Sequence, residues 1–350
     1  MKVVLILSVM IIIIISGCVQ QQEVNTDANN GLVIKAFDTD ISNIRESDRS
    51  FSIHMQVENV GGTTSRVALA SLHGANWVPG YIYESLTAYS PLSPPDITVN
   101  PPTPGDFREV EWKLPTPDLP EGVIQVYDLT GRVLYEYSTS AVANLNAYMR
   151  DEYRRRTDLG ETFSNEITCI NSNAPVKVCV TGPHPMIVDK FYSDEPVEEY
   201  SYRVNFINVG TGMPITHVMN TYTGEVEAVD GLILGRIRVD HPAAFFSDCF
   251  GVSGVNEIEL TPNDNVKLRK GQETTKQCTI GIDKTLWSER PEDTVTIIFE
   301  LYYDYYTEKT IPVTITGERG DRRGVFNTEY SPYRYKYPSI SERIQSYLRS

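Results

Sequence analysis

Short segments in which apolar and polar residues alternate run along most of this chain. In "FSIHMQVEN", residues 51–59, every second residue is apolar: Phe51, Ile53, Met55 and Val57. Such alternation sends one set of side chains to a core and the other set to solvent, as in a half-buried strand. Similar segments predict further strands at 32–37, 66–72, 109–114, 123–129, 132–138, 176–181, 200–208, 232–239, 265–270, 276–282, 294–303 and 309–316. Many short strands with little helix indicate an all-β protein made of β-sandwiches.

The alternating pattern occurs in two copies. The segment "FSIHMQVENVGG" (51–62) recurs as "YSYRVNFINVGTG" (200–212), and both copies end in Asn-Val-Gly. Asn and Gly tolerate the left-handed backbone of a turn, so each copy is predicted to be a strand followed by a turn. The closing strands also correspond, because "YEYST" at 135–139 matches "YDYYT" at 303–307. We therefore predict two sandwich domains in tandem, at residues 31–145 and 174–317.

The segment between the two copies, residues 146–173, changes character. Glu152 with Arg156, and Asp151 with Arg155, have the i,i+4 spacing of helical ion pairs, and Gly160 can end a helix. We predict a short linking helix within 146–160, followed by the start of a hairpin. The three arginines at 154–156 are interpreted as a solvated helix end, and a contact for an acidic partner is the alternative.

The N-terminus has the pattern of an export signal. Residues 1–17 contain one lysine and an apolar run that would rise about 20 Å as a helix, which is short for a bilayer span. Ser16 and Gly17 before Cys18 are similar to a lipobox, which implies cleavage before Cys18 and a lipid on its sulfur. An uncleaved signal anchor is the alternative. Residues 18–30 are polar and are predicted to be a flexible tether between the lipid and the first domain.

The cysteines fit a protein that leaves the cytoplasm. Beside Cys18 there are four cysteines, an even number that permits three disulfide pairings. Cys169 and Cys179 flank a predicted hairpin and could face each other across two strands, which would leave Cys249 to pair with Cys278. Free, buried thiols are the alternative.

Composition and motifs exclude several classes of function. The formal net charge of −15 argues against nucleic acid and anionic membrane surfaces as partners. The chain has no G-x-S-x-G elbow, no phosphate-binding loop and no H-E-x-x-H helix, and its five histidines are scattered. We therefore expect no enzymatic activity, no cofactor and no metal site.

The C-terminal tail, residues 318–350, differs from the body. The segment from Gly317 to the end has seven basic and four acidic residues, and its tyrosines alternate with prolines and basic residues. Ser339 and Glu342 have capping-box spacing, which predicts a short amphipathic helix over 340–349. The apolar face of such a short helix must dock either on the protein's own body or on a partner, because a helix of this length is not stable alone in water. The candidate docking residues are Tyr333, Tyr335, Tyr337, Ile340, Ile344, Tyr347 and Leu348.

These motifs also resemble a known family. A strand ending in "VENVGG" after "GLVIKAFDTDISNI", with a Tyr-acidic-Tyr closing strand, resembles the Ig-like, cell-adhesion-related (CARDB-type) repeats of archaeal and bacterial surface proteins. The lipobox, the Ile-rich leader and the Gln-rich tether resemble archaeal surface lipoproteins. The resemblance implies an all-β fold of two Ig-like antiparallel β-sandwiches in tandem, with a short linking helix and a C-terminal amphipathic tail. It supplies no catalytic residues, because such repeats are mostly stalks, spacers and binding modules.

We expect a structural or interaction protein of the cell surface, anchored by lipid on the extracytoplasmic face of the membrane. It would contact a protein partner or a surface polymer, and the sequence does not indicate its oligomeric state. The alternative is a ligand-binding lipoprotein that takes a glycan or small molecule for a membrane machine. A pocket between the sandwiches, lined by aromatic and convergent polar groups, would favour this alternative. The absence of such a pocket, together with an exposed apolar patch, would favour the first function.

Overall fold

The computed structural model describes residue 24 and residues 26–66, 68–78, 91–189, 195–219, 226–287 and 290–318. Within these ranges the protein is all-β, with one α-helix, α2 (Arg150–Asp158). The strands are β1 (Leu32–Thr39), β2 (Ile44–Arg45), β3 (Ser50–Asn59), β4 (Ala68–His73), β5 (Phe107–Pro115), β6 (Ile124–Met149), β7 (Thr168–Asn171), β8 (Val176–Thr181), β9 (Met186–Val188), β10 (Val197–Asn208), β11 (Met213–Met219), β12 (Val226–Asp230), β13 (Leu234–Asp240), β14 (Ala244–Cys249), β15 (Glu257–Leu260), β16 (Glu273–Asp283) and β17 (Glu292–Thr316).

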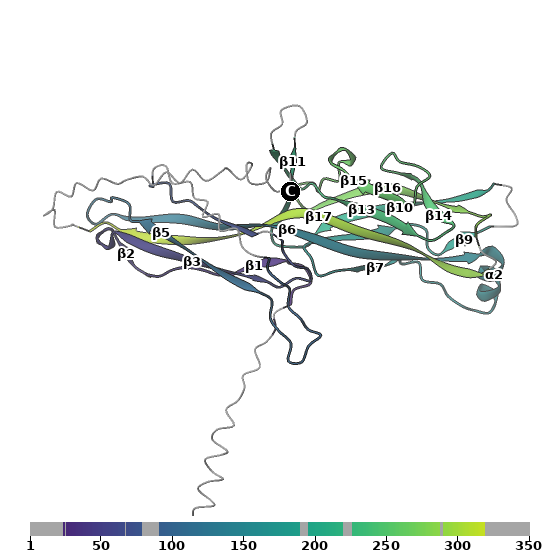
Figure 1. The fold of residues 1–350 in the computed structure, drawn as a ribbon, viewed down its shortest axis with the longest axis horizontal. Coiled ribbons are helices and arrows are strands. Elements are labelled where there is room, and N and C mark those ends of the chain that lie inside the picture. Colours follow the sequence, from purple (N-terminus) through teal and green to yellow (C-terminus); the bar gives the residue numbers. More distant parts are fainter. Residues whose placement is uncertain are drawn as a thin grey trace, which may run out of the picture.

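Two long strands, β6 and β17, form the axis of the molecule. They pair antiparallel along the full 25 residues of β17, from Glu292 opposite Tyr148 to Thr316 opposite Ile124. We call this pair the central ribbon. Figure 1 shows an elongated molecule in which the central ribbon runs along the long axis from one end to the other.

One face of the central ribbon is apolar along almost its whole length. Every odd-numbered residue of β6 from Leu129 to Ala147 is buried, and so is every odd-numbered residue of β17 from Val295 to Thr307. Because side chains alternate between the faces of a strand, these residues all lie on the same side of the ribbon. One uninterrupted alternation of core-facing and outward-facing side chains therefore runs along the central ribbon through both ends of the molecule.

Two smaller sheets cover this apolar face, and we use them to define two lobes. In lobe 1, the sheet β1-β3-β5 covers the end of the ribbon that includes Ile124 and Thr316 (Figure 1). In lobe 2, the sheet β14-β16-β10-β8 covers the end that includes Tyr148 and Glu292 (Figure 1). The ribbon, its neighbours β2, β4, β7, β9, β11 and β13, and the outer strands β12 and β15 form one ten-stranded sheet shared by both lobes. Each lobe therefore has two layers: its own covering sheet, and the ten-stranded sheet that both lobes share.

This arrangement differs from the serial domains expected from the sequence. Residues 307–316, expected in the second domain, pair with residues 124–133 in lobe 1. The segments 123–129 and 132–138, predicted to be separate strands, are one strand, and so are 294–303 and 309–316. The helix α2 lies at one end of the elongated molecule and does not link the lobes (Figure 1). Residues 265–270 form only isolated bridges.

Gly131 lies inside β6, between the two segments that the sequence predicted as separate strands. A Cβ atom at this position would come within about 3 Å of the side chains of Phe37 and Met55, which belong to the covering sheet. The glycine therefore makes room for the second layer inside a continuous strand.

The two Asn-Val-Gly segments form equivalent turns. At the end of β3, the Asn59 amide donates to the carbonyls of Thr63 and Leu92, at 2.9 and 2.8 Å, and its Oδ1 accepts from Gly61 N at 3.1 Å. At the end of β10, Asn208 makes the corresponding three bonds. The repeat noticed in the sequence is therefore a repeated hydrogen-bonded turn.

Tyrosines of the central ribbon hold both turns. The Tyr137 hydroxyl accepts from Thr63 N at 3.2 Å in lobe 1. In lobe 2, the Tyr305 hydroxyl accepts from Gly212 N at 3.0 Å and donates to Asn208 Oδ1 at 2.9 Å. Burial raises the pKa of Tyr305 to about 12, so the phenol stays protonated and can donate at neutral pH.

Both disulfides expected from the sequence are present. Cys169 of β7 is bonded to Cys179 of β8. These strands do not pair as a hairpin, because β7 belongs to the ten-stranded sheet and β8 to the covering sheet, so the bond joins the two layers of lobe 2. Cys249 and Cys278 lie directly opposite each other on β14 and β16, and are also bonded.

We expect Asn208→Ala to lower the free energy of unfolding by about 2 kcal/mol, because two carbonyls and one N–H lose their partner at the end of β10. Asn205→Ala, on the same strand, is the matched control, since its side-chain bonds are exposed. Its expected loss is below about 1 kcal/mol. Urea unfolding measures both values, and equal losses would contradict a special role for the turn.

Candidate functional site: a charged pocket between the lobes

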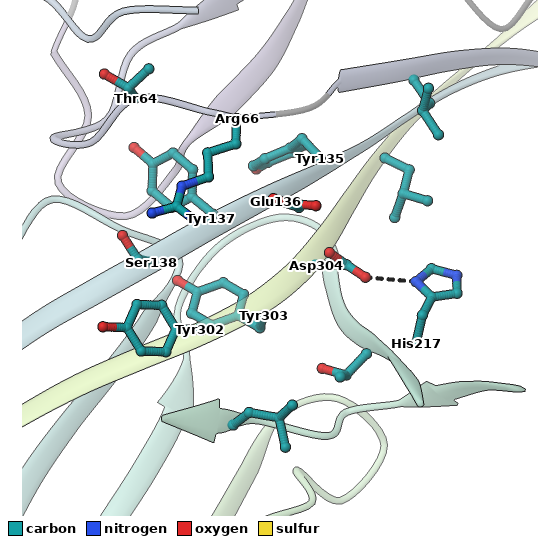
Figure 2. A pocket seen from close by; sticks show the side chains of 14 residues that line it. Thr64, Arg66, Tyr135, Glu136, Tyr137, Ser138, His217, Tyr302, Tyr303 and Asp304 are labelled. Atoms are coloured by element: carbon teal, nitrogen blue, oxygen red, sulfur yellow. Dashed lines mark hydrogen bonds and ion pairs between the residues drawn. The ribbon is translucent and has the colours of Figure 1, made fainter. Parts of the chain in front are cut away.

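A pocket of about 380 Å³ lies at the middle of the central ribbon, where the two lobes meet. Both lobes and the ribbon contribute to it (Figure 2). The residues at its wall from lobe 1 are Thr64, Arg66 and Leu69, and those from lobe 2 are Thr216, His217 and Leu234. The residues from the ribbon are Leu134, Tyr135, Glu136, Tyr137, Ser138, Tyr302, Tyr303 and Asp304.

The alternation of the ribbon explains which groups reach the pocket. The odd-numbered tyrosines face the covering sheets, so the even-numbered residues between them project from the other face. In this way the two Tyr-acidic-Tyr segments each present one carboxylate, Glu136 from β6 and Asp304 from β17. The two residues are direct partners in the ladder.

Like charges directly opposite each other destabilise a pair of strands. His217 of β11 holds one of these carboxylates, because its Nδ1 lies 2.6 Å from Asp304 Oδ2. A carboxylate can only accept a hydrogen bond, so the histidine Nδ1 donates it. Both side chains are mostly buried, at 13% and 21% exposure. Asp304 is therefore fixed in place by this hydrogen bond.

Glu136 has no such partner among the described residues. Figure 2 shows it between Asp304 and Arg66, and the only ion pair drawn among the lining residues is the one between His217 and Asp304. The side chain of Glu136 is exposed, yet partial burial of its carboxyl raises the pKa above its ordinary value. The neighbouring charge of Asp304 adds to this effect, while Arg66 opposes it. The pocket therefore contains a carboxylate that gains stability from any cation brought close to it.

The rest of the wall is mostly apolar. The aliphatic side chains of Leu69, Leu134 and Leu234 line it, together with the hydroxyl residues Thr64, Ser138 and Thr216. Tyr302 is 49% exposed, and its hydroxyl donates to Glu300 Oε2 at 3.3 Å. A few polar and charged groups on a mostly apolar wall are typical of sites for small molecules.

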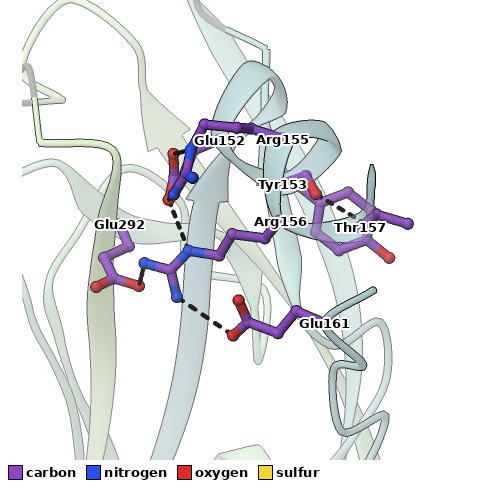
Figure 3. Close-up of polar contacts among 7 residues, drawn as sticks. All are labelled: Glu152, Tyr153, Arg155, Arg156, Thr157, Glu161 and Glu292. Carbon is purple, nitrogen blue, oxygen red and sulfur yellow. Dashed lines mark hydrogen bonds and ion pairs between the residues drawn. The ribbon is translucent and has the colours of Figure 1, made fainter. Parts of the chain in front are cut away.

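The arginines predicted near the linking helix lie elsewhere. Arg156 contacts Glu152, Glu161 and Glu292 (Figure 3), so it joins α2 to the start of β17. Arg155 pairs with Glu152 at i,i+3, and hydrogen bonds from Arg155 and then Arg156 lower the pKa of Glu152 to about 2. The i,i+4 pair of Glu152 and Arg156 is confirmed. Two of the three arginines are therefore engaged within the chain.

Several predicted residues fall outside the described ranges. They include the lipidation candidate Cys18 and the tail residues Tyr333, Tyr335, Tyr337, Ile340, Ile344, Tyr347 and Leu348. Among the described residues, no helix is long and apolar enough to cross a bilayer. In the same part of the chain, no group of three His, Cys, Asp or Glu side chains is placed to hold a metal ion.

Arg66, Glu136, His217 and Asp304 were not predicted from the sequence as site residues. Glu136 and Asp304 are the acidic positions of the two Tyr-acidic-Tyr segments that mark the closing strands. Arg66 and His217 carry no comparable signal, since only the fold brings them to the ribbon.

No protein-family model and no curated protein matches this chain. The likeness to CARDB-type surface lipoproteins therefore stays a prediction from the sequence.

We expect Asp304→Asn to lower the pKa of Glu136, because the substitution removes the neighbouring negative charge. The pKa should stay above its ordinary value, since burial, the larger cause, remains. Carbon-13 NMR titration of the Glu136 carboxyl measures the change. Glu308→Gln, on the same strand and outside the pocket, is the control and should leave the pKa of Glu136 unchanged. An unchanged pKa in Asp304→Asn would contradict coupling across the ladder.

Proposed function

We propose that this protein is a ligand-binding protein of the extracytoplasmic face of the cell membrane, anchored by a lipid on Cys18. The observation that carries the proposal is the pocket between the lobes, with its three leucines, the ring of Tyr302 and its convergent charged groups. This is the feature that separates a binding protein from a purely structural one. The ligand is a small molecule or the end of a glycan.

The size and support of the pocket favour this function. A volume of about 380 Å³ lies within the range of sites that enclose small ligands. Its floor belongs to the central ribbon, which is continuous through both lobes. A site built on paired strands keeps its side chains in place better than one built on loops, and this lowers the cost of ordering them on binding.

A structural or interaction role at the cell surface is the second candidate. It is favoured by the elongated body, in which one ribbon joins both lobes (Figure 1). Under this proposal the two-layered lobes correspond to two Ig-like sandwiches that share their closing strands. The tail residues named above would then dock on a protein partner or a surface polymer. The two roles are compatible, since a rigid spacer can also hold a ligand.

We expect Ser138→Phe to fill the pocket and abolish ligand retention, because Ser138 lines the pocket from β6. Ser140→Phe is the matched control, since Ser140 lies two residues further along the same face and outside the pocket lining. Each variant would be isolated from its native membranes and denatured, and the released small molecules identified by mass spectrometry. Wild type and Ser140→Phe should release the same compound. Equal release by Ser138→Phe, or no compound from wild type, would contradict the proposed function.

The anchor has a separate test. We expect wild type to partition into the detergent phase of a membrane extract, while Cys18→Ser is released or mislocalised because it lacks the acyl chains. Mass spectrometry of the mature N-terminus provides the control for processing. Equal membrane retention of both proteins would favour the uncleaved signal anchor.

A further inference from the structure

The ionisable side chains of the pocket are arranged with the two carboxylates in the middle and the two basic residues on either side. Figure 2 shows Arg66 and His217 on opposite sides of the two carboxylates, Glu136 and Asp304. On the His217 side, the histidine and Asp304 are joined by a 2.6 Å hydrogen bond. On the Arg66 side, the guanidinium and the Glu136 carboxylate remain as one positive and one negative group.

The Arg66 guanidinium and the Glu136 carboxylate do not pair with each other. No ion pair forms between Arg66 and Glu136, and neither side chain makes a hydrogen bond with another described residue (Figure 2). Elsewhere on the ribbon, comparable charges do pair, as Arg132 and Glu308 do on the same two strands. The sheet can therefore hold paired charges, yet the pocket keeps one charge of each sign apart.

The apolar part of the pocket restricts the ligand further. Leu69, Leu134 and Leu234 offer no hydrogen-bonding group, so they fit an aliphatic or aromatic part of a ligand. A ligand that uses the whole site therefore has an ammonium for Glu136, a carboxylate for Arg66, and an apolar side group.

From this complementarity we propose that the pocket binds a small zwitterion, specifically an α-amino acid with an aliphatic side chain. Its ammonium lies on the carboxylates of Glu136 and Asp304, its carboxylate on the Arg66 guanidinium, and its side chain against the leucines. This inference rests on the ligand-binding function proposed above and adds the chemical class of the ligand.

Other ligand classes use less of the site. A simple organic cation would leave Arg66 without a counter-charge, and an anion would do the same to Glu136. A neutral sugar would bury both charges without compensating either of them, which is costly. A metal ion would need more ligands than the described side chains bring together.

The raised pKa of Glu136 agrees with this assignment. Burial and the charge of Asp304 both disfavour the ionised carboxylate in the empty pocket. A bound ammonium would favour the ionised form and bring the pKa down. Affinity should then fall as pH decreases through the pKa of Glu136, because a protonated carboxyl no longer attracts the ammonium.

Calorimetric titration of the full chain with four probes tests the proposal: L-leucine, leucinamide, N-acetyl-leucine and glucose. Leucinamide lacks the carboxylate and N-acetyl-leucine lacks the ammonium. We expect L-leucine to bind at least tenfold more tightly than each of the other three. Tighter or equal binding of any of them, or no binding of L-leucine, would overturn the assignment.

Three variants locate the contacts. Arg66→Gln should abolish the preference for leucine over leucinamide, and Glu136→Gln should abolish the preference over N-acetyl-leucine and flatten the dependence of affinity on pH. Glu308→Gln, a charge change of the same kind outside the pocket, should change leucine affinity less than twofold. Unchanged preferences in both pocket variants would place leucine elsewhere and overturn the inference.

The failure of this inference can be told apart from failure of the proposed function. If wild type releases a compound other than an aliphatic amino acid, and Ser138→Phe does not, the ligand class is wrong and the binding function stands. If Ser138→Phe retains the same compound as wild type, the pocket is not the binding site, and both proposals fail.

Discussion

The backbone ladder between β6 and β17 is the interaction on which the rest of the structure depends. It joins residues that are about 170 positions apart at its centre, where Tyr135 lies opposite Tyr305. Both covering sheets pack on its apolar face, and the charged pocket lies at its middle. Because the ladder continues from one lobe into the other, the lobes share one hydrogen-bonded sheet. A hinge between them would require breaking bonds in the middle of this sheet.

The tyrosines at the centre of the ladder connect its two faces. Tyr135 and Tyr305 have ring centroids 5.7 Å apart, and the hydroxyls of Tyr137 and Tyr305 hold the two Asn-Val-Gly turns. The acidic residues that separate these tyrosines point the other way and form the floor of the pocket. The same alternation therefore builds a buried aromatic core on one side and directs two carboxylates into the pocket on the other. The chain cannot shift the register of the ladder by one residue without exchanging these two environments.

The sequence predicted the all-β class, most strand positions, the repeated turns, the Glu152–Arg156 pair and both disulfides, because each depends on local pattern or on few alternatives. It did not predict the length of β6 and β17. It placed two separate strands at 123–129 and 132–138, although the apolar alternation keeps its phase from Leu129 to Ala147. Gly131, between them, is required by tertiary packing, because the side chains of Phe37 and Met55 approach it closely. The pocket could not be predicted as a set, since the segment before β4, which carries Arg66, and β11, which carries His217, are brought together only by the shared sheet.

The shared ladder also determines when lobe 1 can be completed. Its part of the central sheet needs residues 307–316 to pair with residues 124–133, which precede them by more than 170 positions in the chain. Until residues 307–316 are made, the edge of β6 that they cover presents unpaired backbone groups, which is a template for pairing with another chain. Contacts between such distant segments also close slowly, because the intervening loop must be ordered first. Folding of lobe 1 is therefore tied to the synthesis of β17.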